Sequence, residues 1–201
     1  MGTEAIRIRK AEPRDVVAVA ALYDELNDYL SKHVNYPGWR RGVYPTREDA
    51  EAGAQEDALF VAEADGELAG TFILRHRPEE AYARADWHVE LDYAQILVLY
   101  TFAVHPAFLR RGVGRAIMDY VVRFAADAGM KAVRLDVYEN NLPAIRLYES
   151  CGFDYIDSVD LGYSQYGLDS YRLYQRLLEG ARERAGGNFF GGELAPPSTS
   201  L

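Results

Sequence analysis

A continuous apolar run that passes directly into a glycine-rich turn dominates the middle of the sequence. Residues 96–104 read ILVLYTFAV, which is typical of a strand buried on both faces, and Pro106 ends the run. The letters RRGVG occupy positions 110–114. Apolar residues then recur at helical spacing, at Val113, Ile117, Tyr120, Val121, Phe124 and Ala128. This stretch therefore predicts a strand, a glycine turn and a helix in immediate succession.

The glycine turn predicts an anion-binding site. The first N–H groups of a helix have no intrahelical acceptor, and the helix dipole places positive potential in front of them. Gly112 and Gly114 carry no Cβ, so a bulky anion can approach the backbone closely. Mobile positive charge comes from Arg110, Arg111 and Arg115. The alternative is a tight connection whose arginines are simply solvated.

Two common phosphate-binding motifs do not fit this turn. A dinucleotide-binding fingerprint needs a third glycine where Ile117 stands, and a P-loop needs Gly-Lys-Ser/Thr, which is absent here. The site is therefore of another kind.

A second motif follows after one further strand, and the two motifs together resemble the GNAT superfamily of N-acetyltransferases. In that family a strand ending near Val-x-Pro leads into a pyrophosphate loop, Gln/Arg-x-x-Gly-x-Gly/Ala. The later family motif reads Asn-x-x-Ala-x-x-x-Tyr followed by Gly-Phe, and the matching residues are Asn141, Ala144, Tyr148, Gly152 and Phe153. Leu109 stands where the loop usually has Gln or Arg, which removes one side-chain contact but leaves the backbone N–H groups.

The resemblance runs roughly from Ile6 to Leu177 and implies an α/β (α+β) fold. Six or seven strands form a mixed, mostly antiparallel sheet flanked by about four helices, in the order β-α-α-β-β-β-α-β-α-β-β. The residue pattern itself predicts strands over 5–9, 59–64, 67–74, 132–138, 153–161 and 170–177, and helices over 15–33, 46–56 and 141–152. We expect one N-acetyltransferase domain over 1–179 and a flexible tail over 180–201, where glycines, prolines and serines gather.

By the same resemblance, acetyl-CoA is the cosubstrate and its pyrophosphate is the anion at the glycine turn. The reaction implied is the attack of a neutral amine on the thioester carbonyl, through a tetrahedral intermediate. Main-chain groups of the central strand would bond the pantetheine arm and polarise the carbonyl. The implied cofactor-binding residues are Phe102, Ala103, Val104, Arg110, Arg111, Gly112, Val113, Gly114, Arg115, Asn141 and Ala144.

Tyr148, by its family position, faces the sulfur as the proton donor. A tyrosine of pKa about 10 that protonates a thiolate of pKa about 8.5 does so uphill by roughly 2 kcal/mol. Hydrogen-bond donation to the leaving sulfur is therefore the favoured role. The alternative is that Tyr148 packs with Ala144, Leu147 and Cys151 on a buried helix face.

Asp136 is the candidate base, because some protein N-terminal acetyltransferases of the family carry an acidic residue at the matching place. An aspartate of pKa near 3.9 is a poor base for an ammonium, so Asp136 would act through water or with a raised pKa. The alternative is an ordinary carboxylate on the strand 132–138.

We expect the acceptor to be the primary amine of a small molecule or a peptide. Tyr36, Trp39 and Tyr44 either line its pocket or pack their loop down. The segment 75–93 is polar and irregular, and its histidines, His76 and His88, match no metal-binding spacing, so we expect no metal. Two other classes stay open: a catalytically silent acyl-CoA-binding sensor or interaction module, and an unrelated phosphate-binding protein.

Composition narrows the partners and the location. The net charge of −9 and the pI near 5.0 argue against nucleic acid. No apolar stretch approaches about 20 residues and the first residues lack a signal-peptide core, so we expect a cytoplasmic protein with no membrane partner. Cys151, the only cysteine, is expected to pack in the core. The late strands have edges that could pair between subunits, which is compatible with a homodimer.

Overall fold

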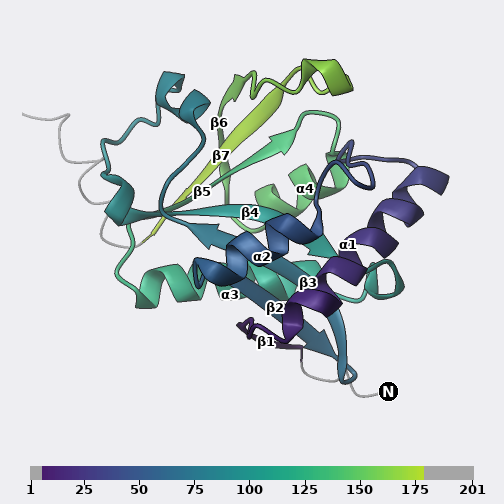
Figure 1. Ribbon diagram of the computed structural model, residues 1–201. Coiled ribbons are helices and arrows are strands. Elements are labelled where there is room, and N and C mark those ends of the chain that lie inside the picture. The colour runs from purple at the N-terminus through teal and green to yellow at the C-terminus, as the bar shows by residue number, and fades with distance from the viewer. Residues whose placement is uncertain (1–5, 179–201) are drawn as a thin grey trace, which may run out of the picture.

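The computed structural model of the chain describes residues 6–178, and these form one mixed sheet between two helical layers (Figure 1). The strands are β1 Arg7–Lys10, β2 Leu59–Ala64, β3 Glu67–Arg75, β4 Ile96–Val104, β5 Ala132–Tyr138, β6 Asp154–Val159 and β7 Tyr171–Leu177. The α-helices are α1 Asp15–Lys32, α2 Arg47–Gln55, α3 Val113–Asp127 and α4 Leu142–Ser150. This order of elements confirms the order expected from the sequence. The predicted tail at 180–201 lies outside the described residues.

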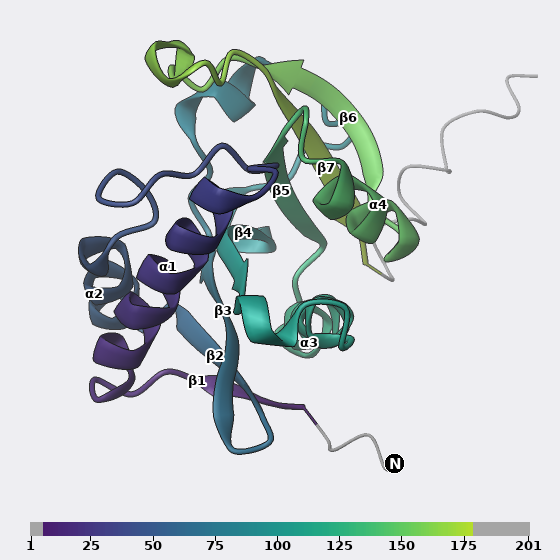
Figure 2. The ribbon, with the colours of Figure 1, turned by 90° about the vertical axis from the view of Figure 1, so that its right-hand side faces the viewer.

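The strands lie in the order β1-β2-β3-β4-β5-β7-β6, and only the β4–β5 pair is parallel. Helices α1 and α2 cover one face of the sheet, and α3 and α4 cover the other (Figure 2). The connection through α3 is what makes β4 and β5 parallel, because a crossover helix returns the chain to the same end of the sheet. The mostly antiparallel sheet expected from the sequence is therefore confirmed.

Local residue chemistry explains two smaller features of the fold, a hairpin turn and a helix cap. Asp65 and Gly66 have φ values of 55° and 77°, as the tight turn between two antiparallel strands requires. At the start of α2, the Asp49 carboxylate accepts hydrogen bonds from the Thr46 N–H at 2.7 Å and from the Thr46 hydroxyl at 3.0 Å. A tight hairpin and a capping box are therefore present at these two points of the chain.

Strands β4 and β5 separate part-way along their length, and this separation positions the site. Their pairing covers only Ile96–Leu99 of β4 and Ala132–Leu135 of β5. Beyond Leu99, β4 stays paired with β3 while β5 stays paired with β7. From Tyr100 onward, the edge of β4 that faces β5 therefore has no strand partner.

An irregularity in β4 changes the face on which its side chains lie. The register against β3 shifts between Tyr100 and Ala103, and Thr101 has a φ of 47°, so the strand contains a bulge. Before the bulge, Leu99 packs on the α3 face. After it, Phe102 packs on that face and Ala103 packs on the α1 face. A regular strand would have placed Ala103 on the α3 side.

The segment 75–93, which we predicted to be polar and irregular, contains a short helix and two buried aromatic residues. A short 3-10 helix, η1, spans Glu80–Arg84, and both Tyr82 and Trp87 are buried. The Arg134 guanidinium lies over the Trp87 indole, with its Cζ 4.0 Å from the centre of the ring. This segment therefore covers the end of the sheet that α1 leaves open. No helix among residues 6–178 is long and apolar enough to cross a membrane.

Candidate active site

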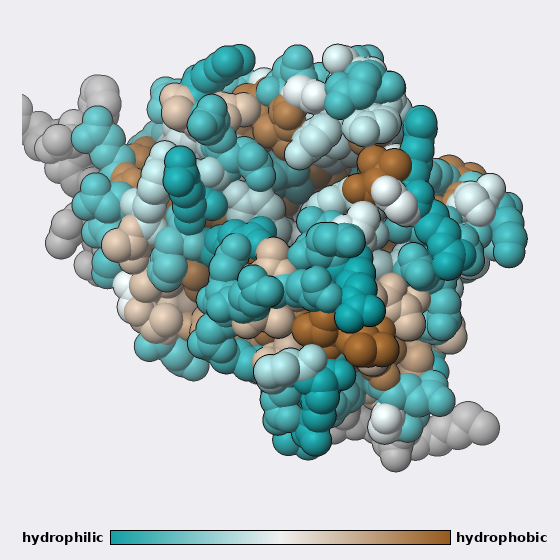
Figure 3. All heavy atoms as spheres, viewed as in Figure 1, coloured by the Kyte–Doolittle hydropathy of each residue, from teal (hydrophilic) through white to brown (hydrophobic). Residues whose placement is uncertain are grey.

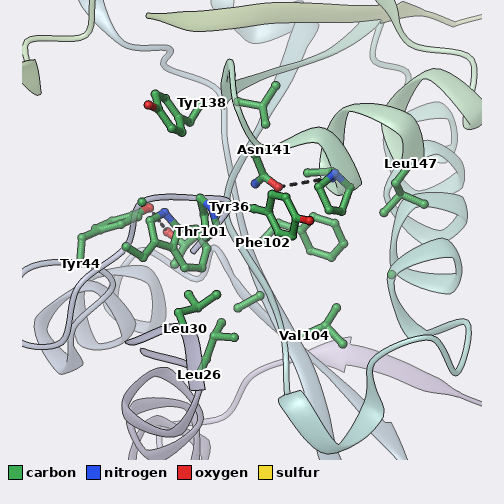
Figure 4. A pocket seen from close by; sticks show the side chains of 18 of the residues that line it. Leu26, Leu30, Tyr36, Tyr44, Thr101, Phe102, Val104, Tyr138, Asn141 and Leu147 are labelled. Atoms are coloured by element: carbon green, nitrogen blue, oxygen red, sulfur yellow. Dashed lines mark hydrogen bonds between the residues drawn. The ribbon is translucent and has the colours of Figure 1, made fainter. Parts of the chain in front are cut away.

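A groove of about 1750 Å³ opens where β4 and β5 separate. It is lined by the ends of these two strands, by the starts of α3 and α4, and by the α1–α2 and β6–β7 loops. Apolar side chains are visible at the hollow in the upper half of the space-filling view (Figure 3). In the close-up, Phe102 and Leu147 lie on the α3 and α4 side of the cavity, and Tyr44 and Leu26 lie on the α1 side (Figure 4). The groove thus has a first half, bordered by α3 and α4, and a second half, bordered by α1 and the α1–α2 loop.

The start of α3 places free backbone donors at the first half. Gly112 is the N-cap, with a φ of 85°, and the first helical hydrogen bond runs from the Ala116 N–H to the Gly112 carbonyl at 3.0 Å. The N–H groups from Gly112 to Arg115 precede that bond, and none has a backbone acceptor within the described part of the chain. Gly112, Val113, Gly114 and Arg115 all line the groove. This geometry suits an anion at the helix terminus.

Gly114 allows α3 to begin close to its neighbours. A Cβ at this position would lie 3.2 Å from Cδ2 of Leu147 and 3.5 Å from Cζ of Phe102. The glycine therefore keeps a narrow space between α3, α4 and β4.

The three arginines of the turn lie in different places. Arg110 lines the groove, and so does Arg115, which also donates to Asp119 at 3.1 Å. Arg111 does not line the groove, because its guanidinium pairs with Asp65 on the β2–β3 turn and lies 4.7 Å from the centre of the Phe108 ring. Arg110 and Arg115 therefore have access to an anion in the groove, whereas the Arg111 guanidinium lies at Asp65, so the structure does not bring Arg111 together with the other two.

The other predicted cofactor residues meet at the same half of the groove. Phe102, Ala103 and Val104 line it from the part of β4 that does not pair with β5. Asn141 and Ala144 line it from α4, where the Ala144 N–H donates to Oδ1 of Asn141 at 3.4 Å. An extended ligand could pair with the free edge of β4 as an added strand would.

Tyr148 lies at the junction of the two halves, and its ring and its hydroxyl have different environments. The ring is buried, with its centre 6.2 Å from that of Phe102 and 6.3 Å from that of Phe153. The hydroxyl forms no hydrogen bond with any residue from 6 to 178. Burial raises the pKa of Tyr148, and the nearby charges of Asp136 and Cys151 add to the effect. The hydroxyl is therefore a protonated, available donor.

Asp136 is not an ordinary exposed carboxylate. Its Oδ1 accepts a hydrogen bond from the Tyr82 hydroxyl at 2.8 Å, and it lines the groove from β5. Burial raises the pKa of Asp136 to about 6; the bond from Tyr82 opposes the rise and the charge of Glu79 adds to it. Within residues 6–178, no basic side chain forms an ion pair with this carboxylate. Asp136 is thus a stronger base than a solvated aspartate.

Sequence reasoning missed two parts of the site. Tyr82 lies in a segment without periodicity, so nothing in the sequence connects it with Asp136. The β6–β7 loop, which we treated only as a connection, lines the groove with Tyr163, Tyr166 and Leu168. Its tyrosines are a compositional signal that could have been noticed.

The aromatic residues of the α1–α2 loop satisfy both of the roles proposed from sequence. Tyr36, Trp39 and Tyr44 all line the groove. The Tyr44 hydroxyl also lies 2.7 Å from Oγ1 of Thr101, and its ring packs edge-on against Trp39 at 5.5 Å. These residues therefore form the wall and pack the loop at the same time. Among the described residues, no cluster of His, Cys, Asp or Glu could hold a metal ion.

Comparison with known proteins identifies the family. The acetyltransferase (GNAT) family model matches residues 19–153 of this sequence. The chain belongs to the GNAT acetyltransferase family. The glycine turn, the free edge of β4 and Tyr148 are therefore parts of a GNAT domain.

Individual relatives agree with this assignment. The chain is similar to the mycothiol acetyltransferase of Thermomonospora curvata, with 34% identity over 151 residues, which cover 75% of this chain and 44% of that protein. It is also 38% identical over 112 residues to the ribosomal protein bS18-alanine N-acetyltransferase of Escherichia coli, covering 56% of this chain and 72% of that one. An uncharacterized N-acetyltransferase of Methanocaldococcus jannaschii is 25% identical over 65% of this chain. The chain spans about half the length of the first and third of these relatives, 44% and 57%.

Solved structures share the fold. A GNAT acetyltransferase from Streptococcus agalactiae aligns with a TM-score of 0.72 and 21% identity, over 87% of this chain and 96% of that one. The protein yncA of Salmonella typhimurium, solved with its cofactor acetyl-CoA, aligns with a TM-score of 0.59 and 21% identity, over 88% of this chain and 95% of that one. The observed architecture is therefore that of GNAT proteins.

Proposed function

We propose that this chain transfers the acetyl group of acetyl-CoA to a primary amine of a small molecule or a peptide, by direct attack through a tetrahedral intermediate. One observation carries the proposal. The free N–H groups at the start of α3, the unpartnered hydroxyl of Tyr148 and the unpaired carboxylate of Asp136 all border one groove. An anion site, a hydrogen-bond donor and a base are what this reaction requires.

The first half of the groove fits the cosubstrate. The N–H groups of Gly112 to Arg115, with Arg110 beside them, would hold its pyrophosphate. The free edge of β4 would bond its pantetheine arm, as one more strand would. Acetyl-CoA then supplies the activated acyl group.

Asp136 would accept the proton of the attacking amine. Its pKa of about 6 makes it a better base than a carboxylate at the ordinary value of 3.8. That difference is about 3 kcal/mol in favour of proton transfer. Against an α-ammonium of pKa about 8 the transfer is still uphill by about 3 kcal/mol, and against a lysine of pKa about 10.4 by about 6 kcal/mol. For amines that fit the groove equally well, proton transfer to Asp136 is therefore easier from an amine of lower pKa.

Tyr148 would steady the leaving sulfur by donating a hydrogen bond. Because burial and nearby negative charge raise the pKa of Tyr148, full proton transfer to a thiolate costs more than it would for a solvated tyrosine. A hydrogen bond needs no such transfer. The packing of the ring fixes the hydroxyl in place for this role.

Calorimetric titration and a thiol-release assay together test the proposal. We expect acetyl-CoA to bind while ATP and NAD do not, and free thiol to appear with at least one amine of a panel of polyamines, amino acids, aminoglycosides, arylalkylamines and short peptides. Tight binding of ATP or NAD without acetyl-CoA would favour the phosphate-binding alternative. Binding of acetyl-CoA without thiol release from any amine would favour the acyl-CoA sensor.

Replacing Tyr148 with phenylalanine should lower kcat about 10- to 100-fold, because one hydrogen bond to a charged group contributes about 1.5 to 3 kcal/mol. The ring contacts remain, so the Kd for acetyl-CoA should not change. The measurement is steady-state kinetics with calorimetry. Tyr155→Phe is the matched control, because Tyr155 is 52% exposed on β6 and its hydroxyl contacts only Ser158. A Tyr148→Phe enzyme that turns over as fast as the Tyr155→Phe enzyme would remove Tyr148 from the mechanism.

A further inference from the structure

The second half of the groove, around Asp136, is built mainly from tyrosines. Burial raises the pKa of six tyrosines and the charge of Asp136 adds to each rise: Tyr44, Tyr82, Tyr100, Tyr148, Tyr163 and Tyr171. All of these except Tyr82 line the groove, and Tyr82 donates to Asp136 itself. We call these six residues the tyrosine cage. A carboxylate surrounded by aromatic rings suits an ammonium group and a flat apolar body.

Two carboxylates, those of Asp136 and Glu79, line this half of the groove. Asp136 has no ion-pair partner within residues 6–178, and Glu79, which also lines the groove, is exposed. The two nearby arginines are engaged elsewhere. Arg40 donates to the Tyr166 carbonyl at 3.1 Å, and Arg75 pairs with Glu56 at 2.6 Å. A carboxylate beside the reacting nitrogen would therefore lie next to Asp136 and Glu79, while Arg75 is already paired with Glu56 and Arg40 is held by the Tyr166 carbonyl.

The β6–β7 loop covers the second half of the groove. We call its residues 160–170 the strap. Arg40 of the α1–α2 loop holds the Tyr166 carbonyl, and the Tyr138 hydroxyl of β5 donates to the Gly167 carbonyl at 3.2 Å. Leu168 packs so closely on Gly38 that a Cβ there would overlap it. The strap thus joins both walls of the groove, and its short helix lies above the α1–α2 loop (Figure 1).

We infer that the acceptor is a compact primary amine with an aromatic or flat apolar body and no carboxylate beside its nitrogen. The nitrogen lies at Asp136, the body packs on the tyrosine cage, and the strap limits its length. A polypeptide acceptor needs an open end through which its chain can continue, and the contacts of Arg40 and Gly38 with the strap close that end. This inference rests on the proposed N-acetyltransferase function and narrows its substrate class.

A matched set of acceptors tests the inference by thiol release with the full chain. The set is 2-phenylethylamine, phenylalanine, and a tetrapeptide amide that begins with phenylalanine. We expect kcat/KM for 2-phenylethylamine to exceed that for phenylalanine about 100-fold, since the two differ only by the carboxylate, and to exceed that for the peptide about 10-fold or more. If phenylalanine or the peptide reacts fastest, the function stands and the inference fails. If no amine of this set or of the wider panel reacts, the proposed function fails and the inference fails with it.

A strap variant tests the size limit separately. Arg40→Ala removes the donor to the Tyr166 carbonyl, and Leu168→Ala removes the contact with Gly38. Each should raise kcat/KM for the tetrapeptide relative to 2-phenylethylamine about 10-fold. Val17→Ala, at a 64% exposed position of α1 outside the groove, should leave the ratio unchanged. Thermal unfolding confirms that the variants fold, and an unchanged ratio in both strap variants would show that the strap does not select the acceptor.

Discussion

Replacing Asp136 with asparagine is expected to lower kcat/KM about 100-fold or more, because a positioned general base contributes about 10²- to 10⁴-fold. Asparagine keeps the size of the side chain and an oxygen that accepts from the Tyr82 hydroxyl. It cannot accept the proton of the amine. Steady-state kinetics with an accepted amine measures the loss. Asp154→Asn, which changes an exposed carboxylate on β6, is the control and should retain full activity.

The same replacement should make the folded protein more stable at neutral pH. The pKa of Asp136 is raised from 3.8 to about 6 on folding, so the folded state binds this proton more tightly than the unfolded chain does. The free energy of unfolding therefore falls as the pH rises from about 4 to about 6, and the loss is complete above that range. A shift of this size corresponds to at most about 3 kcal/mol.

Urea unfolding at pH 4 and pH 8 measures this loss. The Asp136→Asn protein, which has no proton to lose, should gain stability relative to the original chain between these two values. In the original enzyme, kcat/KM should rise with pH through about 6, as the base loses its proton. Equal pH dependence of stability in the two proteins would show that Asp136 is not held as a buried, unpaired acid. Full activity in the variant would exclude it as the base.

The order of elements was predictable because local signals agree with the final packing. The apolar run at 96–104, the Asp65-Gly66 turn and the Asn141 cap each specify their own conformation. The bulge in β4 was not predictable. Thr101 has a φ of 47° without being glycine or asparagine, and its hydroxyl contacts Tyr44, which is distant in sequence. The tertiary structure determines that geometry, and no short window of residues shows it.

Some parts of the candidate site could also be predicted from the sequence, and others could not. The glycine turn and Tyr148 lie within sequence motifs, so the resemblance to the GNAT family was enough to single them out. The raised pKa of Asp136 depends on its burial next to Tyr82, and the link between the α1–α2 loop and the strap depends on the contact of Arg40 with the Tyr166 carbonyl. These are contacts between segments far apart in the chain. The separation of Arg111 from the groove has the same origin, since Asp65 comes from the β2–β3 turn.

Two glycines, one at each end of α3, allow a test of whether the start of this helix binds the pyrophosphate. Gly112 precedes the helix with a φ of 85°, and Gly129 follows it with a φ of 74°; a Cβ at either position meets no atom within 4 Å. Valine at either position is therefore strained by its backbone conformation and not by crowding, at a cost of about 1 to 2 kcal/mol. The two variants should lose similar stability in urea unfolding.

The two variants should differ in their affinity for acetyl-CoA. Gly112→Val should raise the Kd for acetyl-CoA about 100-fold. Relief of the strain reorients the N–H groups from Gly112 to Arg115, and the loss of their charge-assisted hydrogen bonds to the pyrophosphate costs about 3 kcal/mol of binding free energy. Gly129→Val changes the far end of the same helix, outside the groove, and should leave the Kd unchanged. Calorimetric titration of both variants makes the comparison. Equal weakening in both would mean that binding follows overall stability, and no weakening in Gly112→Val would mean that the start of α3 is not where the pyrophosphate binds.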